Sequence, residues 1–127
     1  EGIPSQDGSL TNMDLYVGLR KNAGWCQAFG ERYVYVALNY FNPERVTGIL
    51  DEMVSTMEPE MARHIKRWGT PSSLSEWKSS VKDLRDCLEQ RQSHALTYLQ
   101  REFGFSDAQM EEWKAKATSP SVPEANQ

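Results

Sequence analysis

The stretch FNPERVTGILDEMVSTMEPEMARHIKRW, residues 41–68, decides the fold of this chain. Asn42 stands where a helix N-cap accepts hydrogen bonds from backbone N–H groups. Pro43 follows at the first helical position, where its missing N–H costs no hydrogen bond. Apolar residues then recur at helical spacing, which predicts one apolar stripe along an amphipathic helix: Val46, Ile49, Leu50, Met53, Val54 and Met57.

A proline inside the same stretch, Pro59, predicts that this helix ends and that a second one begins there. Met61, Ile65 and Trp68 lie on one face of the second helix, and we expect Trp68 to fill the core. Gly69 comes next, at the position where many helices end in a left-handed conformation.

Helical signals also precede the stretch. Thr11 or Asn12 would open a first helix, and Gly24 is expected to break or kink it. A longer helix should follow and lie at the centre of the core, because four aromatic and apolar residues fall on one stripe. The stripe consists of Trp25, Phe29, Val36 and Tyr40.

Two more helices are predicted after the stretch. Ser73 and Glu76 have capping-box spacing at the start of a long helix, which Gly104 would end. Ser106 and Gln109 have the same spacing before a short last helix, which we expect to be the weakest element. No run of alternating β-branched residues is present.

The predicted fold class is therefore all-α, a compact bundle of five to six helices. Residues 10–117 would form a single helical domain, because 127 residues suit one hydrophobic core. Residues 1–9 and 118–127 are rich in turn-forming residues, so we expect a flexible N-terminal segment and a flexible C-terminal tail.

The net charge and the hydropathy of the chain limit the kinds of molecule that it could bind. The formal net charge is −4, which argues against nucleic acid as a partner. No apolar run approaches the roughly 18–20 residues that would span a bilayer, so no membrane span is expected. The two cysteines, Cys26 and Cys87, could form a disulfide between helices, but we prefer to interpret them as two small buried apolar side chains.

Three segments carry a family resemblance: GLRKNAGWCQAFGERY at 18–33, the stretch at 41–68, and SEWKSSVKDLRDCLEQR at 75–91. Over roughly residues 10–103, the chain resembles the C-terminal helical part of the spore coat protein H (CotH) kinase family. The family consists of atypical protein kinases. The resemblance implies a secreted, cell-surface or spore-coat location, which the residues themselves leave unknown.

The resemblance also has implications for cofactors. In the family, an acidic metal-binding motif precedes the region that residues 15–40 resemble. We therefore expect no cofactor in this segment, whereas ATP and Mg are implied for a longer parent protein. The parent would transfer phosphate from ATP to Ser or Thr of a secreted or surface protein.

The best candidate for a binding site is an anion site made of Arg63, His64 and Arg67. The two arginines lie four residues apart on one helical face and together could hold an anionic group, with His64 next to Arg63 in the sequence. We prefer a structural interpretation, in which Arg67 pairs with a carboxylate such as Glu60 and Trp68 is buried.

No catalytic or metal-binding residue is assigned from the sequence. His64 and His94 lack the Glu-x-x-His spacing of metal sites in helical bundles, and no nucleophile elbow, P-loop or ordinary kinase signature occurs. Acidic residues such as Asp51 and Glu58 are interpreted as surface charges. Six aromatic residues could form a ligand cage, although we prefer to place them in the core: Trp25, Tyr33, Tyr35, Tyr40, Phe41 and Trp77.

Three functions follow. The preferred one is a non-catalytic helical segment of a CotH-like kinase, with the rest of the parent kinase domain as its partner. The alternative is a helical protein-interaction or adhesion module that binds another protein through an exposed face. An independent small-molecule enzyme is the weakest of the three, because the chain lacks an acid–base or nucleophile constellation.

Overall fold

The computed structural model describes residues 12–119, which form helices and no strands. The all-α class and a count of five helices within this range are confirmed. The helices are α1 (Asn12–Leu19), α2 (Ala23–Asn39), α3 (Pro43–Trp68), α4 (Leu74–Phe103) and α5 (Asp107–Thr118). Residues 1–9 and 120–127 lie outside the described residues, so the flexible ends stay predictions.

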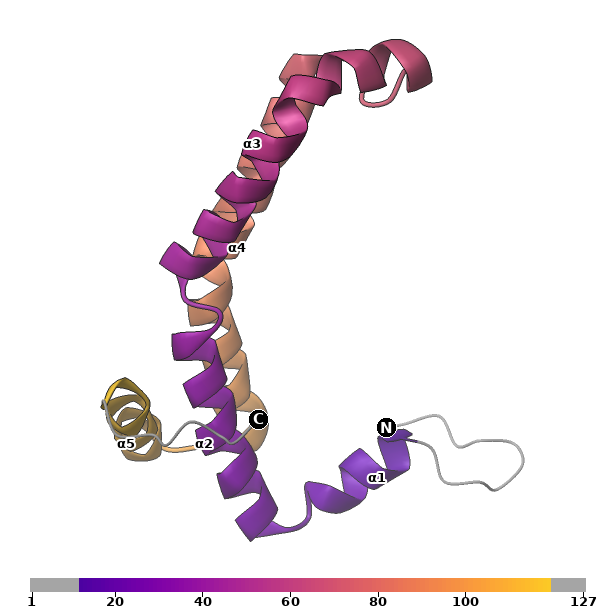
Figure 1. Ribbon diagram of the computed structural model, residues 1–127. Coiled ribbons are helices and arrows are strands. Elements are labelled where there is room, and N and C mark those ends of the chain that lie inside the picture. The colour runs from indigo at the N-terminus through magenta and orange to yellow at the C-terminus, as the bar shows by residue number, and fades with distance from the viewer. Residues whose placement is uncertain (1–11, 120–127) are drawn as a thin grey trace, which may run out of the picture.

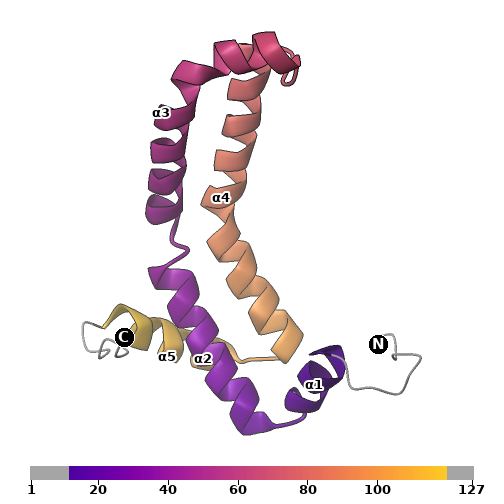
Figure 2. The ribbon, with the colours of Figure 1, turned by 45° about the vertical axis from the view of Figure 1, so that its right-hand side comes forward.

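The longest helix, α4, organises the molecule. Helices α2 and α3 follow one another along it, so that α3 lies beside the first part of α4 and α2 beside its last part (Figure 1). Helix α5 crosses α2, while α1 extends away from the start of α2 (Figures 1 and 2). With 1.5 Å per residue, α4 is about 45 Å long, so the α3–α4 pair forms an extended arm.

The prediction that a new helix begins at Pro59 is wrong, because α3 continues through Pro59 to Trp68. Packing on α4 holds the helix together on both sides of the proline, since Leu50 and Met61 are both buried. Figure 2 shows that α3 bends before it ends, as helices do around an internal proline that removes a backbone hydrogen bond.

The predicted helix ends are confirmed where local side chains or glycines determine them. Asn42 caps α3 by accepting a hydrogen bond of 2.8 Å from the backbone N–H of Arg45. Gly69 and Gly104 adopt φ values of 68° and 67°, the left-handed conformation that ends α3 and α4. Ser106 forms the predicted capping box of α5 with Gln109.

The core lies where α2, α4 and α5 meet. Val34, Leu99, Met110 and Trp113 form its buried cluster, and Trp113 is only 1% exposed. Helix α5 therefore contributes the largest buried side chain of the described residues. That α5 is the weakest element stays a prediction. Partly buried aromatic residues surround the cluster, among them Phe29, Tyr33, Phe103 and Phe105.

The predicted stripe on α2 is wrong in its details. The buried residues of α2 are Gly30, Val34 and Ala37, because α5 and α4 cover that face. Tyr40 from the predicted stripe is 48% exposed. Gly24 does not break the first helix: α1 ends at Leu19, and Gly24 lies in the first turn of α2.

Two further expectations about burial are wrong. Trp68 is 64% exposed, because the end of α3 reaches the tip of the arm, where the fold provides no layer to cover it. Cys26 and Cys87 are free thiols; Cys87 is exposed, and Cys26 is half-buried with its thiol 3.2 Å from the Arg20 carbonyl oxygen. None of the helices within residues 12–119 is long and apolar enough to cross a membrane.

Candidate functional site

The predicted anion cluster lies on the last turns of α3. Arg63, His64 and Arg67 border one shallow depression together with Glu60 and Trp68. As the sequence spacing predicted, the three side chains lie on one side of the helix, and all three are exposed. It is open to solvent, and no buried polar group lies in it.

The charges of this cluster are partly neutralised. Arg63, not Arg67, pairs with Glu60 at 2.6 Å, and both side chains are more than half exposed. The guanidinium of Arg67 instead lies 4.9 Å from the centroid of the Trp68 ring. Exposed ion pairs of this kind contribute about 0–1 kcal/mol. Anion binding by Arg63, His64 and Arg67 therefore stays a prediction.

Two acidic residues of α3 form ion pairs with basic residues of α4. Asp51 accepts a hydrogen bond from Arg85 of α4, and this bond raises the pKa of the Arg85 guanidinium. Glu58 pairs with Lys78 of α4 at 2.7 Å. These carboxylates are thus engaged in surface ion pairs along the arm, which agrees with their interpretation as surface charges.

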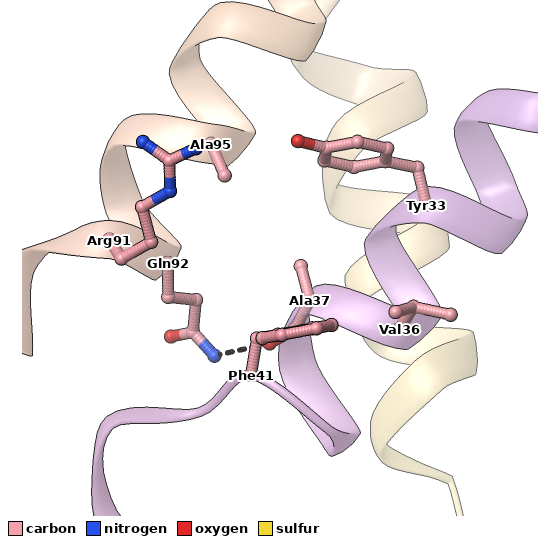
Figure 3. Close-up of a pocket in the computed structure, with 7 residues that line it drawn as sticks. All are labelled: Tyr33, Val36, Ala37, Phe41, Arg91, Gln92 and Ala95. Atoms are coloured by element: carbon pink, nitrogen blue, oxygen red, sulfur yellow. Dashed lines mark hydrogen bonds between the residues drawn. The ribbon is translucent and has the colours of Figure 1, made fainter. Parts of the chain in front are cut away.

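A second depression lies between α2 and α4, with a volume of about 220 Å³. We call it the α2–α4 pocket (Figure 3). Its lining consists of Tyr33, Val36, Ala37, Phe41, Arg91, Gln92 and Ala95. Most of these side chains are apolar or aromatic, and the two aromatic rings face the space between the helices (Figure 3).

The floor of the α2–α4 pocket is fixed by a contact between the two helices. The amide nitrogen of Gln92 donates a hydrogen bond of 2.8 Å to the carbonyl oxygen of Ala37 (Figure 3). Ala37 lies in the last turn of α2, where backbone carbonyls lack partners within the helix. Gln92 therefore caps α2 from the side and holds α4 at a set distance.

Arg91 supplies the positive charge of the pocket. Its guanidinium extends from α4 toward the side where the Tyr33 hydroxyl points, away from Phe41 (Figure 3). Within residues 12–119, the Arg91 side chain has no carboxylate partner and no hydrogen bond. Lys116 on α5 differs, because Glu112 at 2.9 Å and Glu31 at 3.4 Å flank its ammonium group and raise its pKa.

Sequence reasoning missed the α2–α4 pocket as a unit. It named Tyr33 and Phe41 as members of an aromatic set but did not consider Arg91 or Gln92. The available signal was weak: Ala37 and Ala95 are small residues far apart in the sequence, and only the packing of α2 on α4 brings them into one pocket. The other four aromatic residues of that set do not line this pocket.

In the part of the chain from Asn12 to Ser119, no three His, Cys, Asp or Glu side chains gather where they could hold a metal ion. The expectation that this segment holds no cofactor stays a prediction, and no step of phosphate transfer is assigned to these residues.

Comparison with known proteins assigns the family. A search of curated proteins and a search of solved structures each gave no match. The family model described as CotH kinase protein matches residues 5–95, which include α1, α2, α3 and most of α4. Because this match covers well over half of the chain, the protein belongs to the CotH kinase family.

Proposed function

We propose that this chain is a non-catalytic helical segment of a CotH-like protein kinase. The rest of that kinase would bind ATP and Mg and would transfer phosphate to Ser or Thr of a secreted or surface protein. The helical segment would support the catalytic lobe without touching the phosphate, since phosphoryl transfer depends on holding metal, nucleotide and acceptor in line.

Family membership carries this proposal. An exposed apolar row on α3 supports it further. Ile49, Met53 and Met57 recur every four residues, so they share one side of the helix, and they are 41%, 58% and 52% exposed. We call these three residues the α3 row. Leu50 and Met61 of the same helix are buried.

The α3 row is the exposed edge of the one apolar stripe of α3, since Met61 continues the same four-residue spacing and is buried. The buried part of the stripe packs on α4. An apolar edge that stays exposed is typical of a surface that contacts another one. We infer that the rest of the kinase domain covers the α3 row.

The test has two parts. The isolated chain should transfer no phosphate from radiolabelled Mg-ATP to a Ser-rich and Thr-rich protein, and calorimetry should detect no Mg-ATP binding. In a kinase that contains this segment, Met57→Glu should lower phosphotransfer at least about fivefold, because a charge would be placed in an apolar contact. Phosphotransfer by the isolated chain would contradict the proposal.

Ser55→Glu is the matched control for Met57→Glu. Ser55 is exposed and lies on the opposite side of α3 from the α3 row, so the same charge should leave phosphotransfer unchanged. Equal losses in the two variants would show a general effect of acidic charge on α3. In the isolated chain, neither variant should change the urea midpoint appreciably, since both positions are exposed.

A second candidate function is a protein-interaction or adhesion module of a surface or secreted protein. The exposed Trp68 at the tip of the arm, with Arg67 over its ring, favours this candidate. Tryptophan and arginine are the side chains most enriched at binding hot spots. On this reading, the isolated chain would bind an extracellular protein by itself, and Trp68→Ala would weaken that binding without lowering stability.

A further inference from the structure

The α2–α4 pocket has the features of a small ligand site, and they begin with its shape. Ala37 of α2 and Ala95 of α4 both line the pocket, where their short side chains leave space between the two helices (Figure 3). Tyr33 and Phe41 are placed at two sides of that space. A volume of about 220 Å³ exceeds the roughly 150 Å³ cavity that accommodates benzene.

The polar groups of the pocket favour an anion. The guanidinium of Arg91 has no partner among residues 12–119, and it lies on the side of the pocket toward which the Tyr33 hydroxyl points (Figure 3). Both groups can donate hydrogen bonds. A guanidinium with two parallel N–H groups matches a carboxylate in a bidentate geometry.

The end of α2 would normally repel an anion, because helix C-termini carry partial negative charge. Here two of the last carbonyl oxygens are already engaged. Ala37 accepts from Gln92 at 2.8 Å, and Val36 accepts from the backbone N–H of Tyr40 at 2.9 Å. Arg91 also lies on the side of the pocket away from Phe41, which follows the end of α2 (Figure 3).

We propose that the α2–α4 pocket binds a small aromatic carboxylate. The aromatic ring would lie between Tyr33 and Phe41 above Ala37 and Ala95, and the carboxylate would accept hydrogen bonds from Arg91. One arginine suits a single negative charge, whereas a phosphate dianion typically needs a cluster of cations or a helix N-terminus. This site uses neither the α3 row nor the nucleotide chemistry of the proposed kinase.

The test uses 3-phenylpropionate as the probe and follows the amide signals of the complete 127-residue chain by ¹H–¹⁵N NMR. A ligand of this size in an open pocket should bind with a Kd on the order of 1 mM. We expect saturable shifts at Ala37, Phe41, Gln92 and Ala95. The neutral analogue 3-phenylpropanamide should bind at least about fivefold more weakly, because it lacks the charge that Arg91 would pair.

Arg91→Gln is the decisive variant. Arg91 is exposed and has no partner in the described residues, so the variant should fold, and its affinity for 3-phenylpropionate should fall about five- to tenfold. Ala95→Leu should abolish binding by filling the space between the helices. Arg101→Gln is the matched control, because it removes the same charge from α4 at a residue that lies over Tyr98 instead.

Each outcome of these binding experiments either supports the proposed site or overturns it. Pocket shifts that weaken in Arg91→Gln and persist in Arg101→Gln would support the site. Absence of saturable shifts at the pocket with 10-fold more ligand than the expected Kd would overturn it. Equal binding of the acid and the amide, or equal losses in the two arginine variants, would also overturn it, because the charge of Arg91 would then play no specific part.

Discussion

Gly30 of α2 lies directly against the indole ring of Trp113 in α5: a Cβ atom built on Gly30 would be 2.7 Å from Cζ3 of Trp113. The same Cβ would lie 2.7 Å from Cε2 of Phe105. Both neighbours are large rings in the core and cannot move aside freely. The absence of a side chain at Gly30 therefore sets how closely α5 approaches α2.

The first prediction concerns that contact. In a helix interior, Gly→Ala usually stabilises by about 0.5–1 kcal/mol. Gly30→Ala should instead destabilise the protein by about 1–3 kcal/mol, since overpacking a core forces shifts of this cost. The free energy of unfolding from urea titrations measures the change. Gly48→Ala in α3 is the control and should stabilise, because a Cβ there meets nothing within 4 Å.

The second prediction compares two tryptophans. Trp113→Ala should lower the free energy of unfolding by about 3–5 kcal/mol, as truncation of a buried aromatic side chain does. Trp68→Ala should change it by less than about 0.5 kcal/mol, because that side chain is 64% exposed. Comparable losses in both variants would show that Trp68 is covered in solution.

The third prediction concerns the start of α3. Asn42→Ala should cost about 1 kcal/mol of stability, because it leaves the Arg45 N–H without the side-chain acceptor that caps the helix. Asn42→Asp should retain most of the stability, since a carboxylate accepts the same bond and suits the positive end of the helix dipole. Chemical denaturation of the three proteins side by side measures both changes.

The fourth prediction concerns pH. Hydrogen bonds from the side chain and the backbone N–H of Ser72 lower the pKa of Glu76 below its usual 4.5. A carboxyl group whose pKa is lower in the folded state stabilises the fold above its unfolded pKa. That stabilisation is lost as the pH falls through the folded pKa. Glu76→Gln should therefore lose less stability than the unmodified protein between pH 7 and pH 3.

Ser72→Ala provides the control for this pH effect. It removes the hydroxyl donor but keeps the backbone N–H, so the pKa of Glu76 should rise partway toward 4.5. Carbon-detected NMR of the Glu76 carboxyl group would measure the change. An identical acid response of the unmodified protein and Glu76→Gln would mean that Glu76 does not contribute to the pH dependence.

The elements predicted from the sequence were those that depend on local chemistry. Asn42, Ser106 and Gln109 satisfy backbone groups three residues away, and Gly69 and Gly104 adopt a conformation that favours glycine. Such features involve only neighbouring residues, so the sequence contains nearly all the information. The all-helical class was predictable for the same reason.

The errors arose where distant packing decides the outcome. Pro59 ends a helix in isolation, but burial of Leu50 and Met61 against α4 keeps α3 continuous. Trp68 has the periodicity of a core residue, yet it lies where the arm has no covering layer. The burial of Trp113 in the short last helix was not predicted, because nothing near it in the sequence shows that Gly30 opens a space for its ring.

The α2–α4 pocket was unpredictable for a related reason. Its members come from α2, the turn after α2, and α4, and the hydrogen bond that sets how the two helices lie joins Gln92 and Ala37, which are 55 residues apart. A side chain that caps a helix from another helix leaves no local sequence signal. By contrast, the anion-site candidates lie within five consecutive residues, so sequence spacing alone placed them on one side of α3: Arg63, His64 and Arg67.

The distribution of buried side chains along the α3–α4 arm affects how the protein opens. The core cluster lies where α2, α4 and α5 meet, whereas the arm has mainly Leu50 and Met61 to hold α3. Backbone amides near the turn after Gly69 should therefore exchange with solvent through local fraying, while those of α2 and α5 should exchange only when the whole fold is lost. The arm can thus adjust its tip to a contacting surface at little energetic cost.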